Sequence, residues 1–543
     1  MHKKKKRRIF HPFLVAVFPI LIIYSENIGR VNFEDLILPI ILVLIFSVGL
    51  YYILKIILKN PFKSALIVTI ILILLFSYGH VYYLLNDVSI DGFDIGRNLY
   101  LIPAFGLALG ILIFFTIRAG RVFDNATSII NVVSIVLIMV AISNVVLVGA
   151  EIINYDKDAS QELLYETRDF SGYFEPHKFL ISENQELPDV YYLILDEYAR
   201  NDALLEYHDF SNHELTEFLE NKGFHIAKNS FANYPMSVQS IPATMNMNYI
   251  NFLADEIGTE VRNYKPLNEK NYGLYANNMV IKNFKEMNYK IITFNTFALH
   301  LHENPLSNET FCHRDTFLLD NRLVDVLART SIFGYYVERW AEGELRQVTL
   351  CAFENFGNAG NVFDEPVFVW AHIMLPHPPW IFGPNGEEII PGKPLLITDN
   401  PEFRDSGWEP KKQYIQQVQF ANKKTIEVVE NILENNKNAI IIIQGDHGTA
   451  WETNWMDPSK DDAWQRLRNF DAIYFPDEEK RVQLNDDRTL VNTFRIIFNS
   501  YFGSEYEILD DRMYWGSNDK PYNFEEVTQF VLDKLKLKII NKE

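Results

Sequence analysis

Five long apolar runs, none interrupted by a charged side chain, lie within the first 150 residues. A transmembrane helix needs roughly 17–25 residues of this kind, and each run approaches or exceeds that length. The first run is the shortest and contains Pro12 and Pro19, so a cleaved signal peptide is its alternative interpretation. No small-residue cleavage site follows it and four more runs do, so we expect a retained helix. The five predicted spans are Ile9–Ser25, Leu36–Leu54, Ser64–Asn86, Leu99–Ile117 and Ala126–Ala150.

Charge is distributed as unevenly as hydropathy. Residues 1–150 contain 13 basic and 7 acidic residues, which gives a net charge of +6. Of the 50 basic and 70 acidic residues in the whole chain, 37 and 63 remain for the rest, a net charge of −26. A basic, apolar first part followed by an acidic second part predicts a membrane anchor that carries a water-soluble domain. Because phosphate backbones repel so acidic a domain, we expect the bilayer as a partner and no nucleic acid.

The positive-inside rule orients the predicted spans. Basic residues precede the first span and fill the second and fourth connections, whereas acidic residues dominate the first and third. Five crossings from a cytoplasmic N-terminus place everything after Ala150 outside the cytoplasm. We therefore predict an integral protein of the plasma (inner) membrane. Its three parts are an anchor of five helices (1–150), a connector rich in charged and aromatic residues (151–186) and an extracytoplasmic domain (187–543).

The segment Asn438–Gly448 reads Asn-Ala-Ile-Ile-Ile-Ile-Gln-Gly-Asp-His-Gly. Four consecutive isoleucines are typical of a strand buried on both faces, as in a parallel sheet covered by helices. Asp446 and His447 follow at the carboxyl end of this strand, where ligands bind in open α/β sheets. A carboxylate beside an imidazole is half of a divalent-metal site. The alternative is a turn in which Asp446 caps a helix and His447 has no chemical role.

A second apolar run, Asp189–Leu195, ends in Asp196, which therefore occupies the same kind of position as Asp446. A helix cap is the alternative role for this aspartate. Helical spacing marks the segments between the apolar runs, notably Tyr414–Leu433. Strands that alternate with helices predict a mostly parallel sheet in an α/β/α sandwich. The further predicted strands are Tyr289–Phe294, Pro366–Ala371 and Phe470–Phe475.

A candidate nucleophile lies in the segment Asn233–Asn246. Pro242 suits the first turn of a helix, and this would place Ser237 just ahead of the helix amino end. Backbone N–H groups and the helix dipole there favour an alkoxide or a bound phosphate. The alternative is that Ser237 or Ser240 merely caps the helix.

The chain has two cysteines, Cys312 and Cys351, and the predicted topology places both on the oxidising side of the membrane. A disulfide and a pair of buried thiols are equally consistent with their spacing.

Four motifs, in this order, resemble the alkaline phosphatase–sulfatase superfamily. An anchor ahead of an extracytoplasmic domain resembles its membrane branch, the lipoteichoic acid synthases and phosphoethanolamine transferases. The resemblance runs from about Leu187 to Pro476 and implies an alkaline phosphatase-like sandwich. The motifs are Ile194-Leu-Asp196-Glu, Ser237-x-x-Ser240-x-Pro-Ala-Thr, His372-x-x-x-Pro-His377-Pro-Pro-Trp and Gly445-Asp446-His447-Gly448.

The resemblance also implies the roles of individual residues. Asp196, Asp446 and His447 would ligate one divalent cation, with Ser237 as the nucleophile and fourth ligand. His377 would face the non-bridging oxygens or the leaving group of the substrate. Carboxylates, imidazole and an alkoxide suit Mn²⁺, Zn²⁺ or Mg²⁺, and the sequence does not choose between them.

The implied activity is transfer or hydrolysis of a phospho-linked group, of phosphoglycerol or phosphoethanolamine type, through a covalent serine intermediate. The expected substrates are a membrane lipid, its head group or a cell-envelope glycan. His372, Ser240 and Asn295 are further candidates for substrate contact. Ser240 corresponds to the serine of the sulfatase signature, for which a structural role is the alternative.

Two other functions remain as alternatives. A sulfatase would convert Ser237 into formylglycine, and the resemblance implies that it needs an arginine four residues later, where this chain has Ile241. A non-catalytic membrane receptor that keeps the fold would bind no metal. The candidate ligands for a second metal are His300, His302 and His313. Histidines in such a segment more often lie in a loop or in the core than bind a metal, so we expect one metal.

Overall fold

The computed structural model describes residues 8–28, 31, 33–85, 88–90, 93–119, 123–158, 170–174, 176–177, 179, 186–260, 267, 273–296, 304–312, 321–389, 409–451, 453–454, 460–517 and 520–540. The chain forms two compact units. The membrane unit comprises Met1–Ser160 and Asp315–Ala341, and the sheet unit comprises Gln161–Arg314 and Glu342–Glu543. Each unit is described by itself.

The membrane unit has a helix at each of the five predicted spans. Four of the helices in the described part of the chain are long and apolar enough to cross a membrane. The first helix has 16 residues, or about 24 Å at 1.5 Å per residue, which is less than the roughly 30 Å of a hydrocarbon core. Length and composition thus allow four of the described helices to span a membrane, and a fifth crossing stays a prediction. The helices are α1 (His11–Glu26), α2 (Ile37–Leu58), α3 (Pro61–Leu85), α4 (Asn98–Arg118) and α5 (Phe123–Asp158).

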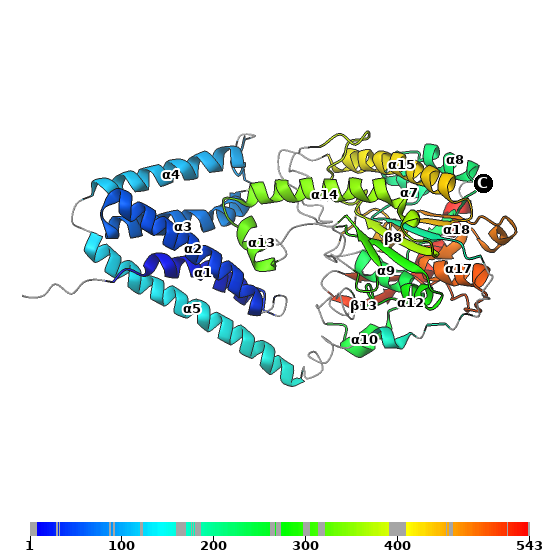
Figure 1. The fold of residues 1–543 in the computed structure, drawn as a ribbon, viewed down its shortest axis with the longest axis horizontal. Coiled ribbons are helices and arrows are strands. Elements are labelled where there is room, and N and C mark those ends of the chain that lie inside the picture. The colour runs from blue at the N-terminus through cyan, green and yellow to red at the C-terminus, as the bar shows by residue number, and fades with distance from the viewer. Residues whose placement is uncertain are drawn as a thin grey trace, which may run out of the picture. The chain divides into compact units, whose positions relative to one another are not determined.

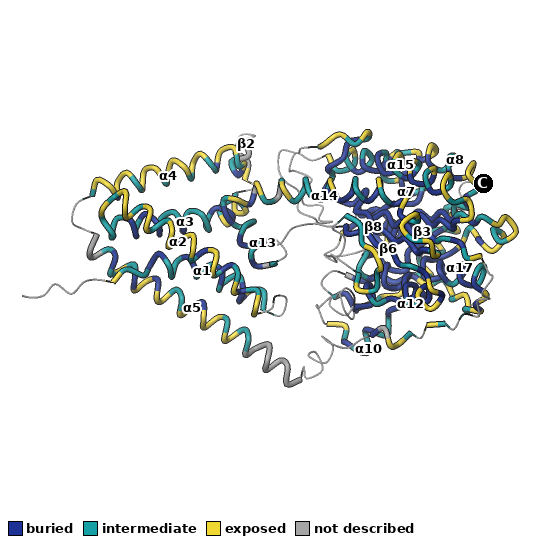
Figure 2. Tube along the Cα trace, viewed as in Figure 1, coloured by how far each residue is buried: buried dark blue, intermediate teal, exposed yellow. Residues whose placement is uncertain are grey.

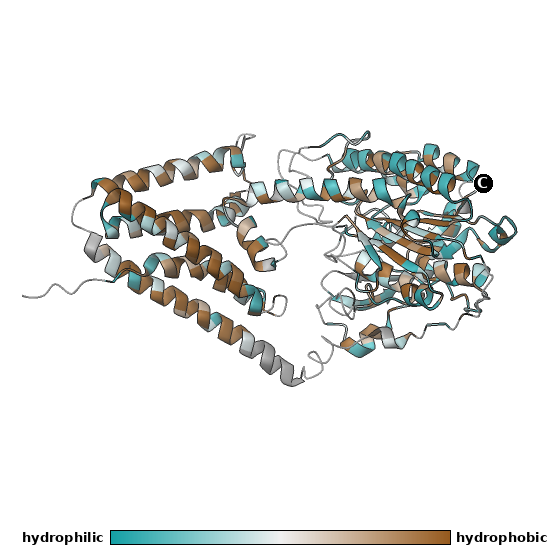
Figure 3. Ribbon diagram, viewed as in Figure 1, coloured by the Kyte–Doolittle hydropathy of each residue, from teal (hydrophilic) through white to brown (hydrophobic). Residues whose placement is uncertain are grey.

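The outer surfaces of these helices are apolar. Ile56, Leu99, Phe115 and Val146 are among the large hydrophobic side chains that α2, α4 and α5 expose. Figures 2 and 3 show exposed residues and apolar residues along the same helices. Because exposed apolar patches of this extent are unfavourable in water, they indicate surfaces that face lipid.

The sheet unit is built on a seven-stranded sheet with the order β4-β10-β9-β3-β8-β6-β7. Strands β9, β3, β8, β6 and β7 run parallel, as the sequence predicts for most of the sheet. Strand β10 is antiparallel to both of its neighbours, so the sheet is mixed. The strands are β3 (Val190–Leu195), β4 (His225–Ile226), β6 (Lys290–Phe294), β7 (Glu309–Phe311), β8 (Val367–Ile373), β9 (Ile440–Gly445) and β10 (Asp471–Tyr474).

The direction of β10 corrects the expectation that the segment Phe470–Phe475 repeats the design of the other strands. Its amino end, and not its carboxyl end, lies beside the carboxyl end of β9, because Asp471 pairs with Gln444. A short buried strand next to another strand is stable in either direction, so its composition did not reveal its orientation.

Helices cover both faces of the sheet, which makes three layers. In β3, Tyr191, Leu193 and Leu195 enter one hydrophobic core, and Val190, Tyr192 and Ile194 enter the other. This explains why the strand is apolar at every position. Helices α7 (Asn201–His208), α8 (His213–Asn221), α14 (Gly334–Phe356) and α15 (Pro410–Asn435) contribute to the first core, and α9 (Ser237–Met245), α12 (Met279–Glu286) and α17 (Thr493–Tyr501) to the second (Figure 1).

The remaining elements are short. A 3-10 turn at Leu490–Asn492 precedes α17, and α18 is the last helix in the described part of the chain. Two-stranded sheets pair β1 with β2, β5 with β11 and β12 with β13. The bounds are β1 (Ser89–Ile90), β2 (Phe93–Asp94), β5 (Asn229–Phe231), α10 (Phe252–Ile257), α13 (Arg322–Arg329), α16 (Lys460–Arg466), β11 (Asp487–Thr489), β12 (Tyr514–Ser517), β13 (Lys520–Glu526) and α18 (Thr528–Ile540).

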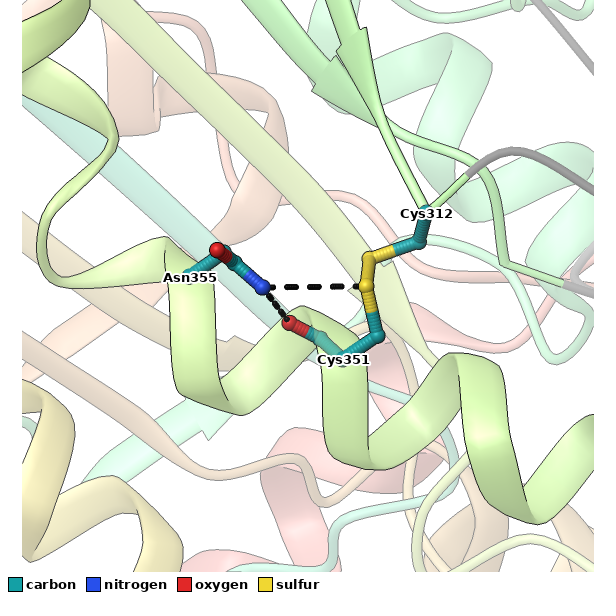
Figure 4. Close-up of a disulfide and its surroundings, with 3 residues drawn as sticks. All are labelled: Cys312, Cys351 and Asn355. Atoms are coloured by element: carbon teal, nitrogen blue, oxygen red, sulfur yellow. Dashed lines mark hydrogen bonds between the residues drawn. A yellow bond between two sulfur atoms is a disulfide. The ribbon is translucent and has the colours of Figure 1, made fainter.

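The two cysteines form a disulfide between the residue after β7 and helix α14 (Figure 4). The Cα atoms of Cys312 and Cys351 are 5.9 Å apart. Asn355 lies one turn further along α14 and donates a hydrogen bond of 2.8 Å to the carbonyl oxygen of Cys351. Of the two interpretations that the spacing left open, the structure selects the disulfide.

Removal of this disulfide is expected to destabilise the protein. The bond closes a loop of 39 residues, for which the chain-entropy model gives about 4 kcal/mol of stabilisation. The double variant C312S/C351S should therefore unfold at a lower temperature than the wild type, and reduced wild-type protein should match the variant. Free thiols in the denatured, unreduced wild type would contradict the disulfide.

Candidate active site

Three neighbouring parallel strands end at one edge of the sheet. Asp196 follows β3 and Asp446 follows β9, and Leu195 pairs with Gly445 directly before them. His372 is the penultimate residue of β8 and pairs with Ile194. The register therefore brings two carboxylates and an imidazole together from segments that are far apart in the sequence.

These three side chains have the geometry of metal ligands. One ligand atom from each of Asp196, His372 and Asp446 lies within 4.8 Å of the others, and all three residues are buried. His372 Nε2 is 3.1 Å from Asp196 Oδ2 and 3.9 Å from Asp446 Oδ2. Asp196 Oδ1 and Asp446 Oδ2 are buried and accept no hydrogen bond within the described part of the chain. Because such carboxylate oxygens are costly without a partner, this donor set fits a divalent cation.

His447 adds a fourth donor to the cluster. Its Nε2 atom is 3.3 Å from Asp446 Oδ2 and 3.8 Å from Asp196 Oδ1. Its Nδ1 atom is 3.2 Å from the carbonyl oxygen of Gly448, which can only accept, so Nδ1 carries the proton. Nε2, which faces the carboxylates, is then the ring atom that could ligate a metal.

Backbone donors fix the orientation of the Asp446 carboxylate. Its Oδ1 atom accepts hydrogen bonds from the backbone N–H of Glu197, at 3.1 Å, and of His447, at 3.0 Å. Oδ2, the atom that lacks a hydrogen-bond partner, therefore faces the imidazoles. Backbone hydrogen bonds thus hold Oδ1 of Asp446, whereas Oδ2 is placed where it could bind a ligand.

Ser237 lies next to this cluster. Its Oγ atom is 3.1 Å from His447 Nε2, and the residue is half-buried. The structure corrects the predicted local geometry, because α9 begins at Ser237 itself and Pro242 lies inside the helix. The hydroxyl is therefore on the first helical residue, where N–H groups without intrahelical partners favour negative charge.

Ser240 has a different environment. Its hydroxyl is buried and donates a hydrogen bond of 2.6 Å to the carbonyl oxygen of Asp446. This contact ties α9 to the loop after β9. The hydroxyl of Ser240 thus bonds to the protein backbone, and a substrate contact of this residue stays a prediction.

His377 is attached to the cluster through the backbone. Its N–H donates to the carbonyl oxygen of Asp196 at 3.2 Å, and its Nδ1 donates to the carbonyl oxygen of Pro378 at 2.6 Å. The carbonyl oxygen can only accept, so Nδ1 carries a proton.

The histidines determine the charge of Asp196. Burial raises the pKa of this carboxyl group, but the nearby His377, His372 and His447 outweigh burial, and the pKa lies well below its usual range. Asp196 is therefore ionised at physiological pH, as a metal ligand must be.

Asn295 directly follows β6, the neighbour of β8, and the next residue, Thr296, donates from Oγ1 to the carbonyl oxygen of His372 at 2.5 Å. The backbone N–H of Asn295 donates to the carbonyl oxygen of Phe311 on β7 at 2.9 Å, and a substrate contact of Asn295 stays a prediction. His300, His302 and His313, the candidates for a second metal, lie outside the described residues.

Sequence reasoning missed a buried ion pair that supports the site. Arg466, at the end of α16, has Nη1 3.4 Å from Glu197 Oε1 and 3.1 Å from the carbonyl oxygen of Gly448. Its Nε donates to the carbonyl oxygen of Pro235 at 2.8 Å, and its Nη2 is 3.1 Å from His447 Nε2. Glu197 follows Asp196 directly and so lay within a recognised motif. Arg466 had no comparable signal, because only tertiary packing brings α16 to the site.

No family model and no curated protein matches this sequence. Solved structures that resemble it include the C-terminal periplasmic domain of EcEptC from Escherichia coli in complex with Zn, at 12% identity, 65% coverage of this chain, 96% of that chain and a TM-score of 0.42. The phosphonate monoester hydrolase of Agrobacterium radiobacter is 13% identical over 60% of this chain and 80% of its own, with a TM-score of 0.39.

A further similar structure is the integral membrane protein lipooligosaccharide phosphoethanolamine transferase A from Neisseria meningitidis. It is 10% identical, covers 90% of this chain and 94% of its own, and has a TM-score of 0.34. Because these TM-scores lie below 0.5, the chemistry of this site is derived from the chain's own side chains.

The Glu197–Arg466 pair yields a stability prediction. Arg466→Met should leave a buried carboxylate without its cation and cost about 3–5 kcal/mol of unfolding free energy. The double variant E197Q/R466M should recover part of that loss, because it removes the unpaired charge. Denaturant unfolding of the three proteins measures the difference, and a double variant less stable than R466M would contradict the pairing.

Proposed function

We propose that this protein is a metal-dependent transferase or hydrolase of phospho-linked groups, acting through a covalent serine intermediate. The substrate would be a membrane lipid or envelope glycan with a head group of phosphoglycerol or phosphoethanolamine type. One observation carries the proposal: Ser237 Oγ lies 3.1 Å from the same His447 nitrogen that faces the two buried carboxylates.

Asp196, Asp446 and His447 would hold the cation, together with Ser237, and the geometry adds His372 to the set. Mn²⁺, Zn²⁺ and Mg²⁺ all accept ligands from carboxylates and imidazoles. A bound divalent cation lowers the pKa of a hydroxyl and polarises a phosphoryl oxygen.

The chain's own residues would carry the group transfer. Ser237 Oγ, after releasing its proton to solvent, attacks phosphorus in line, the Oγ–P bond forms, and the P–O bond to the leaving alcohol breaks. Nε2 of His377, when protonated, gives its proton to the leaving oxygen. A second alcohol or water then gives a proton back to Nε2 of His377 and attacks the same phosphorus, and the bond to Ser237 breaks. Whether the acceptor is an alcohol or water distinguishes a transferase from a hydrolase.

The proposed location is the plasma (inner) membrane, with the N-terminus in the cytoplasm and the sheet unit outside it. The Cys312–Cys351 disulfide supports this orientation, since disulfides persist in oxidising compartments. Attachment to a membrane raises the effective concentration of a lipid substrate at the site.

The position at which the resemblance implies an arginine in a sulfatase, four residues after Ser237, is occupied here by an apolar residue. Ile241 is 1% exposed and lies in the second hydrophobic core, where no arginine could replace it without a partner for its charge. Mass spectrometry of the peptide that contains Ser237 should therefore find unmodified serine. Formylglycine at this position would favour the sulfatase alternative.

Ser237→Ala should abolish turnover because it removes the hydroxyl that lies 3.1 Å from His447 Nε2. Labelled phosphatidylglycerol and phosphatidylethanolamine, supplied in vesicles to the full-length protein, report the activity. The matched control is Ser240→Ala, which removes a hydrogen bond to the backbone but leaves the nucleophile, and it should retain measurable turnover. Undiminished activity in S237A would refute the nucleophile.

Asp446→Asn should lower metal content and activity together, because it removes the charge of one buried carboxylate. The matched control is Asp189→Asn, at the amino end of β3, where the side chain accepts the N–H of Val367 at 2.9 Å. Elemental analysis of the purified variants measures metal content. Equal metal in D446N and wild type would rule out the proposed ligand set, and unchanged metal in His372→Ala would remove His372 from it.

A further inference from the structure

The membrane unit contains a segment that the sequence assigned to the extracytoplasmic domain. Residues Asp315–Ala341 cluster with the membrane helices, and the boundary between the two units falls inside α14. Within the described part of this segment lie α13, the turn after it and the first turns of α14.

Helix α13 is seated on the membrane helices through apolar and polar contacts. Leu323 and Leu327 are buried in a core that includes residues of α1, α2 and α3. Asn321, which caps α13, donates from Nδ2 to the carbonyl oxygen of Asp35 at 3.0 Å, just ahead of α2. The packing of α13 against the membrane helices therefore depends on a specific hydrogen bond as well as on apolar contacts.

The turn after α13 contacts the backbone of α3 directly. Gly79 N–H donates to the carbonyl oxygen of Thr330 at 3.1 Å, and Ile332 N–H donates to the carbonyl oxygen of Leu75 at 3.1 Å. A Cβ atom on Gly79 would lie 2.3 Å from the Thr330 oxygen, so only glycine permits this approach. The backbone of residues 330–332 thus occupies the space that a side chain at position 79 of α3 would fill.

These contacts lie on one side of the membrane. Asp35 precedes α2 and Gly79 is near the end of α3, six residues or about 9 Å along the axis from Leu85. Four successive crossings by α2–α5 put the start of α2 and the ends of α3 and α5 on the same side. Segment 321–341 thus docks on the side at which the chain leaves the membrane after α5.

Three exposed aromatic side chains follow the docked turn. Phe333, Tyr336 and Trp340 are 54%, 63% and 41% exposed, and spacings of three and four residues put the latter two on one helix face beyond Phe333. Aromatic residues at the ends of membrane spans concentrate at the level of the lipid head groups, where their rings are apolar and their polar atoms reach water.

We infer that Phe333, Tyr336 and Trp340 form a lipid-contacting surface at the extracytoplasmic face, in the head-group layer of the bilayer that α2–α5 span. This aromatic surface continues the lipid-facing exterior of the membrane helices, because the docked turn fixes it to α3. It is an interaction surface for the bilayer, separate from the site at the sheet edge.

Nitroxide labels on the full-length protein test the position of the aromatic surface. The chain's two cysteines are joined in the disulfide, so a cysteine introduced at Phe333 or Tyr336 is the reactive thiol. The labelled protein is reconstituted in vesicles of phosphatidylcholine and phosphatidylglycerol, mixed at about 4:1, in roughly physiological salt. Control labels replace Leu205 and Val482, exposed apolar residues of the sheet unit.

Collisions with molecular oxygen should exceed collisions with the polar nickel complex Ni-EDDA at 333 and 336, and the order should reverse at both controls. Equal access of the nickel complex to positions 333, 336 and 482 would overturn the inference. Protection of 333 and 336 from both reagents, with spin–spin broadening, would also overturn it and would indicate a contact between two copies of the chain.

A glycine pair tests the docked turn. Ala at Gly79 would collide with Thr330, whereas a Cβ on Gly106 of α4 meets no atom within 4 Å. G79A should therefore raise nickel access at position 333 severalfold, and G106A should leave it at the wild-type value. Unchanged access in a folded G79A would refute the role of the docked turn, and should G79A fail to fold, the wild-type accessibilities decide the inference.

Discussion

Two carboxylates buried side by side at the ends of adjacent strands are the constraint on which the rest of the sheet unit depends. The register that pairs Leu195 with Gly445 delivers Asp196 and Asp446 to one point, where their like charges repel in a medium that screens poorly. The imidazoles of His372 and His447 reduce that cost, and a cation would remove most of it. A slip of one residue between β3 and β9 would send one carboxylate to the opposite face of the sheet and abolish the cluster.

Other buried polar groups hold this arrangement in place. Arg466 binds Glu197 and the carbonyl oxygens of Pro235 and Gly448, so one guanidinium connects the segment before the serine with the loop after the strand. Ser240 connects the same two segments from the helix side. A network in which every member has a partner orients its side chains with little freedom, which is what the proposed in-line attack by Ser237 would require. The proposed nucleophile is thus placed by groups that would take no part in bond making.

The sequence predicted some of these features for physical reasons that are local. Asp196, Asp446 and His447 could be found because each lies within a few residues of the carboxyl end of an apolar run, and a parallel sheet places the ends of such runs together. The start of α9 was mispredicted because Pro242 is compatible with both a first turn and an interior position of a short helix. The direction of β10, the ligand geometry of His372 and the contacts of Arg466 depend on which segments become neighbours, and no single segment encodes that information.

By itself, the sequence determined that apolar runs enter a membrane, that a sheet of buried strands follows them, and that acidic and imidazole groups end those strands, since hydrophobic periodicity and charge act over a few residues. Only the tertiary structure decided that Cys312 and Cys351 bond, that Ser237 faces His447, and that residues 321–341 return to the membrane helices. Those outcomes require contacts between distant segments, and they result from the packing of the whole chain, where the absence of a side chain at Gly79 can matter as much as the presence of one at Asp446.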